Sequence, residues 1–376
     1  MKAYAYCPKQ GRHEVVDLPD PEIRQPDEIK VEVIRVGVCG TDQEISHGHI
    51  GEPPPGCDFL VIGHENLGRV VGAGPDVKEF KPGDLAVMTV RHSCGECPPC
   101  LHGLPDLCET GKYTERGVIR LHGNATKYVV DSERNACPVP SALESIAVLA
   151  EPMSVVEKGI AMAVEMQHRI PWPCAHPEHG WDQPGWGFDK NVFVAGAGPV
   201  GLLAAYVLAL HGCKIWVQDI LPEDHPRIQL AKSLGAKYIC GKDVKPEQIP
   251  SIAGPIDMVI EATGNGQVAY GLLPVLGANG IFCFLGIPSP HVPIQIDGGA
   301  LIREQVIENQ VAFGSVSANK SHFIQALRDM QEGEQKYPGV LEKMITRHLP
   351  FNQFDEAFDR RDANDIKTVV EIQGQV

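Results

Sequence analysis

A glycine-rich turn between an apolar strand and an apolar helix places the strongest constraint on how this chain can fold. Gly196-Ala-Gly198-Pro-Val-Gly201 follows a predicted strand at 191–195 and begins a predicted helix at 199–211. The first glycine permits the tight turn, the second lets the backbone approach a pyrophosphate, and the third lets the helix pack on the strand. Asp219 ends the next predicted strand, 23 residues after Gly196, where a ribose-binding acid belongs. A merely structural glycine turn is the alternative, but this placement favours dinucleotide binding.

Strands and helices alternate along the chain after this turn. A helix is predicted at 226–234, between Pro226 and Gly235, and further strands are predicted at 214–218, 237–240, 257–262, 281–285 and 311–316. Alternation at this spacing indicates βαβ units and a parallel sheet. We therefore expect an α/β domain over residues 189–318.

The rest of the chain has a different pattern. Short β-rich runs at 29–38, 66–72, 85–90 and 126–130 are separated by turn residues, which predicts an antiparallel, barrel-like domain. The C-terminal part holds a predicted amphipathic helix at 322–331 and a strand at 368–372. Its mixed pattern suggests a return to the first domain.

Four cysteines lie within 15 residues, as Cys94-x2-Cys97-x2-Cys100-x7-Cys108. A ferredoxin-type iron–sulfur run has its fourth cysteine after three residues and followed by proline, whereas Glu109 follows Cys108 here. A closed tetrahedral zinc site fits the spacing better, and would fix a lobe that has little core of its own. The alternative is four unrelated buried cysteines in one polar loop.

Charge and the N-terminal sequence exclude other classes of protein. There are 33 Lys and Arg against 48 Asp and Glu, a formal net charge of -15, so nucleic acid and anionic membranes are poor partners. The uncharged stretches 192–210 and 262–296 contain glycines and prolines that suit a buried α/β interior better than a membrane span. The sequence MKAYAYCPKQG lacks a signal-peptide apolar region, so we expect a cytoplasmic protein with reduced thiols.

Three dispersed motifs are candidates for a second metal site. They are Gly37-Val-Cys39-Gly-Thr41-Asp42, Gly63-His64-Glu65 and Ala150-Glu151-Pro152. Each alone is more often structural. A nicotinamide enzyme, however, needs an electrophile to polarise an alcohol or carbonyl, and an open zinc site with sulfur, nitrogen and oxygen ligands supplies one.

The order of these motifs resembles that of the zinc-dependent medium-chain dehydrogenases over essentially the whole chain. Five segments resemble the glucose (aldose) 1-dehydrogenase branch: TDQEI after Cys39, PPPGCDFLVIGHE, KYTERG at 112–117, LAEPMSVVEK at 149–158 and ENQVAFGSVSANKSHF at 308–323. The resemblance implies a GroES-like β-rich catalytic domain at 1–188, completed by 319–376. A Rossmann domain with a doubly wound parallel sheet at 189–318 would complete the α/β fold, with the active site in the cleft between the domains.

The resemblance also implies roles for single residues. Cys39 and His64 would hold a catalytic zinc, with Glu65 and Glu151 as ligands or close neighbours, and Cys94, Cys97, Cys100 and Cys108 a structural zinc. Thr41 would meet the reacting hydroxyl, Glu115 and Asn309 would contact the sugar, and Asn309 would also lie near the nicotinamide. The dinucleotide would be bound by Gly196, Gly198, Pro199, Val200, Gly201 and Asp219, with Leu285 and Gly286 lining the nicotinamide pocket.

The expected reaction is zinc-assisted hydride transfer from C1 of an aldose such as glucose to NAD(P), giving the lactone. Asp219 repels a 2′-phosphate and no arginine follows it, which favours NAD over NADP. Alternatives are a zinc polyol, secondary-alcohol or threonine-type dehydrogenase and, from another class, a non-catalytic zinc- and nucleotide-binding regulator. A homodimer or homotetramer is expected. Residues 171–188, a longer loop than usual in the family, could reshape the entrance to the site.

Overall fold

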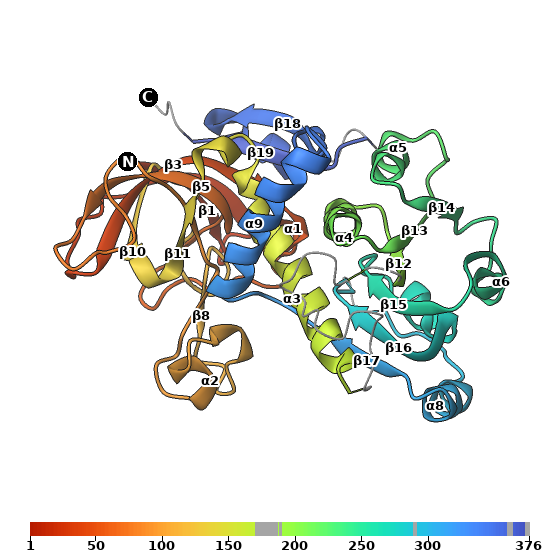
Figure 1. The fold of residues 1–376 in the computed structure, drawn as a ribbon. Coiled ribbons are helices and arrows are strands. Elements are labelled where there is room, and N and C mark those ends of the chain that lie inside the picture. Colours follow the sequence, from red (N-terminus) through yellow and green to blue (C-terminus); the bar gives the residue numbers. More distant parts are fainter. Residues whose placement is uncertain (170–186, 188–189, 289–291, 359–363, 373–376) are drawn as a thin grey trace. The chain divides into compact units, whose positions relative to one another are not determined.

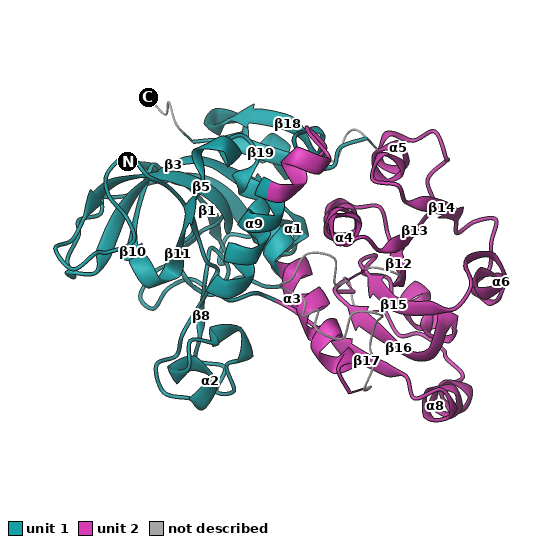
Figure 2. Ribbon diagram, viewed as in Figure 1, with its two compact units in different colours: residues 1–154, 317–331, 341–376 teal, residues 155–316, 332–340 magenta. Residues whose placement is uncertain are grey.

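The computed structural model describes residues 1–169, 187, 190–288, 292–358 and 364–372 (Figure 1). Nearly all of the 171–188 loop therefore lies outside the described residues. The chain divides into two compact units (Figure 2): unit 1 comprises residues 1–154, 317–331 and 341–376, and unit 2 comprises residues 155–316 and 332–340. Among the described residues, no helix is both long and apolar enough to cross a membrane.

Unit 1 is built around the long strand β3 (Glu28–Val38), whose buried and less buried residues alternate over its first half. β3 pairs antiparallel with β5 (Glu65–Ala73), β10 (Tyr128–Ser132) and β19 (Lys367–Glu371). The strand order of this sheet is β11-β6-β5-β3-β19-β18, with β10 also on β3. Its further strands are β6 (Leu85–Met88), β11 (Ala136–Val139) and β18 (Ile345–Pro350). The C-terminal part thus completes the largest sheet of unit 1.

Two small sheets and three short helices complete the part of unit 1 that bears on the sites. One sheet has the order β2-β1-β4 and the other the order β7-β8-β9. The strands are β1 (Lys2–Cys7), β2 (Arg12–Asp17), β4 (Leu60–Val61), β7 (Arg91–His92), β8 (Thr114–Arg116) and β9 (Arg120–Leu121). The helices are α1 (Gly40–Ser46), α2 (Pro98–Leu101) and the 3-10 helix at Pro105–Leu107.

Unit 2 holds a parallel sheet with the strand order β14-β13-β12-β15-β16-β17. In chain order this is 3-2-1-4-5-6, the doubly wound arrangement. The strands are β12 (Asn191–Ala195), β13 (Lys214–Asp219), β14 (Lys237–Cys240), β15 (Ile256–Glu261), β16 (Leu276–Phe284) and β17 (Val311–Gly314). The helices are α4 (Pro199–Leu210), α5 (Pro226–Ser233), α6 (Ile249–Ala253), α7 (Gly266–Gly271) and α8 (Gly298–Ile307).

The local sequence explains the central βα turn of unit 2. The residues of β12 after Asn191 are fully buried, as a strand covered on both faces requires. Pro199 occupies the first helical position of α4, where its missing N–H costs nothing. The helix ends before Gly212, whose φ of +80° is accessible mainly to glycine.

The boundary between the units differs from the expected one at residue 188. It falls at 154/155, inside α3 (Ala150–Gln167), so that only the first turn of this helix belongs to unit 1. The reason is packing: a Cβ on Gly159 would lie 2.9 Å from Leu285 and 3.1 Å from Cys283, so α3 lies close against β16 and the residue after it. The end of α9 (Lys320–Lys336) likewise groups with unit 2, where Lys336 donates to the carbonyls of Ala209 and Leu210.

Candidate functional site

The register of three strands in unit 1 brings together residues that are far apart in the sequence. Gly37 of β3 pairs with Glu65 of β5, and Val38 of β3 pairs with Thr368 of β19. The chain leaves β3 at Cys39, enters β5 after His64, and enters β19 at Lys367. One end of the sheet therefore carries a thiol, an imidazole, a carboxylate and an ammonium group.

Cys39 is held by the helix that it begins. It is the N-cap residue of α1: its sulfur accepts a hydrogen bond from the Thr41 amide at 3.3 Å, and its own amide donates to Asp42 Oδ2 at 3.0 Å. The His64 Nε2 atom lies 3.2 Å from the Cys39 sulfur, and its Nδ1 atom lies 3.5 Å from Asp42 Oδ1. The fully buried Asp42 thus contacts both the Cys39 backbone and the His64 ring.

Glu65 is paired with a lysine that sequence reasoning missed. Both oxygens of its carboxylate accept hydrogen bonds from Lys367 Nζ, at 2.6 and 2.7 Å, and both side chains are almost completely buried. A buried charge without a partner is strongly unfavourable, so each group requires the other. The only sequence signal for this pair is a lysine immediately before an apolar strand, 302 residues from its partner.

Glu151, the second residue of α3, lies within electrostatic range of this group. Burial raises the pKa of its carboxyl to about 7. The positive His64 and Lys367 oppose that rise, while the negative Glu65 and Asp42 add to it. Glu151 can therefore hold or release a proton near neutral pH.

These residues fit a zinc ion by their donor chemistry and spacing. The ligand atoms of Cys39, His64 and Glu65 all lie within 4.8 Å of one another. In a tetrahedral zinc site, a thiolate sulfur and an imidazole nitrogen are about 3.5 Å apart, close to the 3.2 Å observed. Burial disfavours a proton on His64, but the Cys39 sulfur and the Asp42 carboxylate outweigh this and raise its pKa. A cation between Cys39 and His64 would replace that proton.

Of the expected sugar contacts, Glu115 is firmly positioned in unit 1. Its Oε1 atom accepts a hydrogen bond from Arg91 Nε at 2.9 Å and forms an ion pair with Arg91 Nη2 at 2.8 Å. Arg91 also donates to the Asp106 carbonyl at 3.1 Å and stacks 4.0 Å from the Tyr113 ring. Arg91, which the sequence did not single out, thus joins Glu115 to the lobe that contains the four cysteines.

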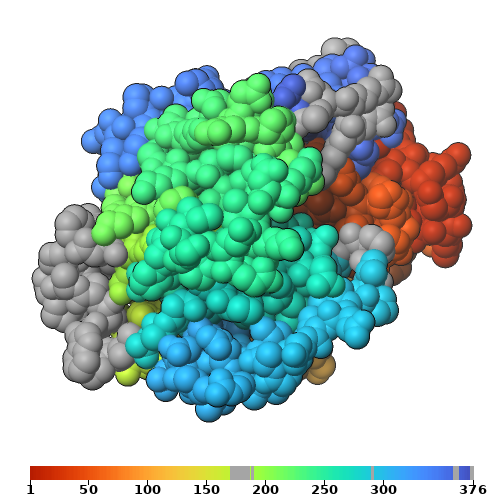
Figure 3. All heavy atoms as spheres, turned by 90° about the vertical axis from the view of Figure 1, so that its right-hand side faces the viewer, coloured from red at the N-terminus to blue at the C-terminus, as the bar shows by residue number. Residues whose placement is uncertain are grey.

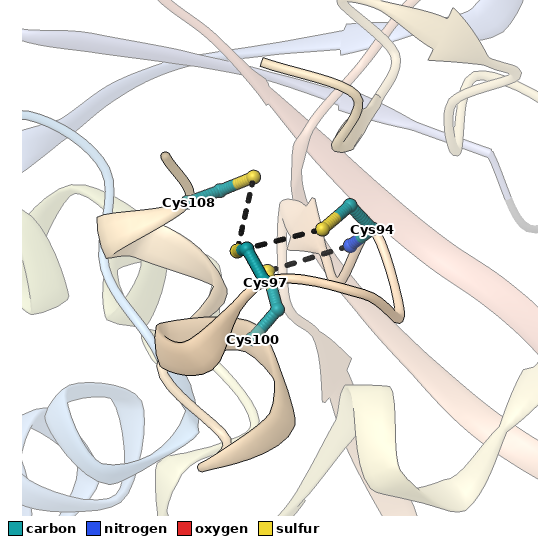
Figure 4. Close-up of side chains that lie close together, drawn as sticks. All are labelled: Cys94, Cys97, Cys100 and Cys108. Carbon is teal, nitrogen blue, oxygen red and sulfur yellow. Dashed lines mark hydrogen bonds between the residues drawn. The ribbon is translucent and has the colours of Figure 1, made fainter. Parts of the chain in front are cut away.

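The four cysteine side chains of that lobe point toward one another (Figure 4). The sulfurs of Cys94 and Cys97 lie 3.5 Å apart, and those of Cys97 and Cys108 lie 3.9 Å apart. Four thiolates on one zinc would be about 3.8 Å apart, given zinc–sulfur bonds of about 2.3 Å. The Thr110 hydroxyl and the backbone N–H groups of Glu96 and Cys97 lower the pKa of Cys94 to about 6, which favours the thiolate that a metal binds.

The glycine turn of unit 2 has the geometry of an anion-binding loop. Gly196 has a φ of +99°, and a Cβ on Gly201 would lie 1.8 Å from the Gly196 carbonyl oxygen, so both positions require glycine. A Cβ on Gly198 would meet nothing within 4 Å, and no side chain caps the N-terminus of α4. Neither a Cβ at position 198 nor a capping side chain therefore stands between a phosphate group and the first turn of α4, with Pro199 and Val200.

Asp219 closes this turn from β13. Its Oδ2 atom accepts a hydrogen bond from the Ala197 amide at 2.6 Å, and its Oδ1 atom accepts from the Ile220 amide at 2.7 Å. The acid thus lies next to the glycine turn. Leu285 and Gly286 follow β16 at the same edge of the sheet, where both of their amides donate to the Glu261 carbonyl.

The structure does not bring Asn309 to this edge. Asn309 precedes β17, which runs parallel to β16. It therefore lies at the amino ends of the strands, whereas the glycine turn lies at their carboxyl ends. Its φ is +51°, and its carbonyl accepts a hydrogen bond from Arg169 at 2.9 Å. The expected contact of Asn309 with nicotinamide and sugar is therefore corrected: its position fits a turn before the strand.

Comparisons with known proteins agree with this geometry. The family model "Glucose dehydrogenase C-terminus" matches residues 144–372, and "Alcohol dehydrogenase GroES-like domain" matches residues 25–141. A glucose 1-dehydrogenase from Methanocella arvoryzae is 37% identical over 99% of both chains, and one from Thermoproteus tenax is 36% identical over 95% of both. The solved structure of Haloferax mediterranei glucose dehydrogenase in complex with NADP, Zn and gluconolactone matches 99% of both chains, with a TM-score of 0.86 and 31% identity.

The buried pair of Glu65 and Lys367 gives a first prediction. Lys367→Met leaves the Glu65 charge buried without its partner, and should destabilise unit 1 by about 3–5 kcal/mol. The double variant Glu65→Gln/Lys367→Met removes both charges and should recover most of this loss. Chemical denaturation followed by circular dichroism measures the difference. A double variant no more stable than Lys367→Met would refute the pairing argument.

The four-cysteine lobe gives a second prediction. Cys97→Ser removes one of four thiolates, so the protein should lose one zinc per chain and become sensitive to proteolysis within 94–112. Metal analysis and limited proteolysis measure both effects. Cys57→Ser is the matched control, because Cys57 is exposed and belongs to neither cluster. Unchanged metal content in Cys97→Ser would exclude a four-thiolate site.

Proposed function

Because the chain belongs to the glucose dehydrogenase branch of the zinc-dependent medium-chain alcohol dehydrogenases, we propose that it oxidises C1 of an aldose, such as glucose, to the lactone with a nicotinamide dinucleotide. The observation that carries the proposal is the cluster of Cys39, His64 and Glu65, where β3 ends and β5 begins. The anion-binding turn at Gly196–Gly201 supports the dinucleotide. The gluconolactone in the Haloferax mediterranei structure supports the product class.

Cys39 and His64 would hold the catalytic zinc, together with one carboxylate. Lys367 engages both oxygens of Glu65, so Glu65 approaches an ion only by sharing its charge with the lysine. Glu151 is then the carboxylate available for direct ligation. Glu65 and Glu151 could also replace each other as the zinc ligand during the reaction. When bound, zinc would supply a Lewis acid for the substrate oxygen, and a nicotinamide would supply the hydride acceptor.

Residues of the chain would accept and transfer the proton that the reaction releases. Oxidation at C1 releases one hydride and one proton, and the proton comes from the C1 hydroxyl. Thr41, in the first turn of α1, would accept it; its amide donates a hydrogen bond to the Cys39 sulfur. Glu151, whose pKa lies at about 7, could take the proton on toward solvent while it is not serving as a ligand. Glu115, fixed by Arg91, would hold a sugar hydroxyl through its carboxylate.

An initial-rate panel tests the substrate class. We expect aldoses to be oxidised with much higher kcat/KM than polyols and simple secondary alcohols. Cys39→Ala should lower kcat/KM with the best aldose by on the order of 10³-fold, since a Lewis acid stabilises the transition state by several kcal/mol. Cys57→Ala is the control and should keep full activity. Cys39→Ala with full zinc-dependent turnover, or a panel in which only polyols react, would overturn the proposal.

We propose NAD rather than NADP as the preferred cofactor. The support is Asp219 beside the glycine turn, with Ile220 and Leu221 after it where a cation would bind a 2′-phosphate. The Haloferax mediterranei structure contains NADP, so the preference needs a direct test. Asp219→Ser should shift the NAD/NADP ratio of kcat/KM toward NADP by about tenfold or more, because it removes like-charge repulsion.

The matched control for Asp219 is Asp224→Asn, an exposed acid in the following loop, which should leave the ratio unchanged. A wild-type enzyme that already prefers NADP, or an Asp219→Ser ratio equal to wild type, would contradict the assignment.

We also propose a homodimer or homotetramer in the cytoplasm. β17 lies at one end of the unit 2 sheet and carries alternating exposure. Ile302, Val306 and Ile307 of α8 are largely exposed, and Figure 3 shows the face of unit 2 on which α8 (blue) lies. All described cysteines are free, which agrees with a reducing compartment. Light scattering that gives a monomer would contradict the assembly.

A further inference from the structure

We propose a third divalent-metal site in this protein, formed by Glu44, His47 and His49 at the C-terminal end of α1. One ligand atom from each residue lies within 4.8 Å of the other two. None of these residues belongs to the cluster of Cys39, His64 and Glu65 or to the four-cysteine lobe. The assignment does not depend on the proposed function.

The backbone preforms this group. Glu44 lies in the last turn of α1, His47 caps the helix with its amide on the Gln43 carbonyl, and the His49 amide donates to the Glu44 carbonyl at 3.0 Å. Gly48 reverses the chain with a φ of +72°, a conformation that other residues rarely adopt. The three side chains thus start from fixed positions on a single turn.

The side chains already face one another. The Nδ1 atom of His49 lies 2.8 Å from Glu44 Oε2, and the rings of His47 and His49 have centroids 5.7 Å apart. A hydrogen now lies between Glu44 and His49, and an ion would take its place. Two imidazoles and one carboxylate are a recurring zinc donor set, and leave a fourth position for water.

This chemistry selects the class of ion. Imidazole nitrogen favours Zn²⁺, Cu²⁺ and Ni²⁺, whereas Mg²⁺ and Ca²⁺ require oxygen ligands. His47 and His49 are exposed, so the ion would exchange with solvent and bind more weakly than at the four thiolates.

An ion here would brace the helix that carries the catalytic thiol. α1 begins at the Cys39 cap, and the Ser46 hydroxyl donates to the Asp42 carbonyl at 2.8 Å near its end. Because α1 has only seven residues, a clamp from Glu44 to His49 fixes its last turn to the turn that follows. The expected consequence is a higher thermal midpoint at added zinc, without any step of the reaction passing through the ion.

Titration of the zinc-loaded enzyme with ZnCl₂ in a calorimeter tests the site. Wild type should bind one further equivalent of zinc. His47→Ala/His49→Ala should weaken this binding at least tenfold and abolish the zinc-dependent rise in the thermal midpoint. Glu44→Gln, which keeps the size of the side chain, should weaken it to a smaller extent.

His348→Ala is the matched control. The side chain of His348 is as exposed as that of His49, at 52%, and its Nδ1 atom lies 3.0 Å from Glu371 Oε1. Among the described residues, however, His348 belongs to no group of three potential metal ligands. It should retain the third equivalent. Absence of that equivalent in wild type, its persistence in His47→Ala/His49→Ala, or an equal loss in His348→Ala would overturn the proposal. Without added zinc, the variants should have the same thermal midpoint as wild type, which checks that they fold.

Discussion

The register of β3 against β5 and β19 is the constraint on which the site in unit 1 depends. Gly37 lies opposite Glu65 and Val38 opposite Thr368, so Cys39, His64 and Lys367 converge although more than 300 residues separate the first from the last. A shift of one residue in either pairing would turn alternate side chains to the other face of the sheet. The buried hydrophobic residues of β3 oppose such a shift, because they would leave the core.

Buried charges complete what the register begins. Asp42 faces His64, and Lys367 faces Glu65, so each ionic group in the cluster has a partner of opposite charge. Replacing a buried pair by apolar groups often leaves stability unchanged, so pairing alone does not explain why charges are present. Their value lies in orientation: Asp42 fixes both the Cys39 amide and the His64 ring, while Lys367 fixes the carboxylate of Glu65.

The two main metal clusters differ in how the fold builds them. The four cysteines lie within 15 residues, around one short helix and a 3-10 turn, so local backbone geometry is enough to assemble them. The Cys39 cluster instead depends on strand pairing in the sheet of unit 1. Arg91 connects β8 to the cysteine lobe, since it binds Glu115 on β8 and the Asp106 carbonyl inside the lobe. The lobe thereby helps to position an expected sugar contact.

The sequence by itself determined the features that are local in the chain. The strands predicted at 191–195 and 237–240 have the observed bounds. The glycine turn and the four-cysteine spacing each indicate a binding function from a short stretch of sequence. Only the tertiary structure decided the features that depend on pairing between distant segments. The structure pairs Lys367 with Glu65 and shows that Arg91 binds Glu115. It also places Asn309 at the amino ends of the parallel strands, opposite the carboxyl ends that carry the glycine turn. The physical reason is that strand register and direction, which no short motif encodes, place these side chains.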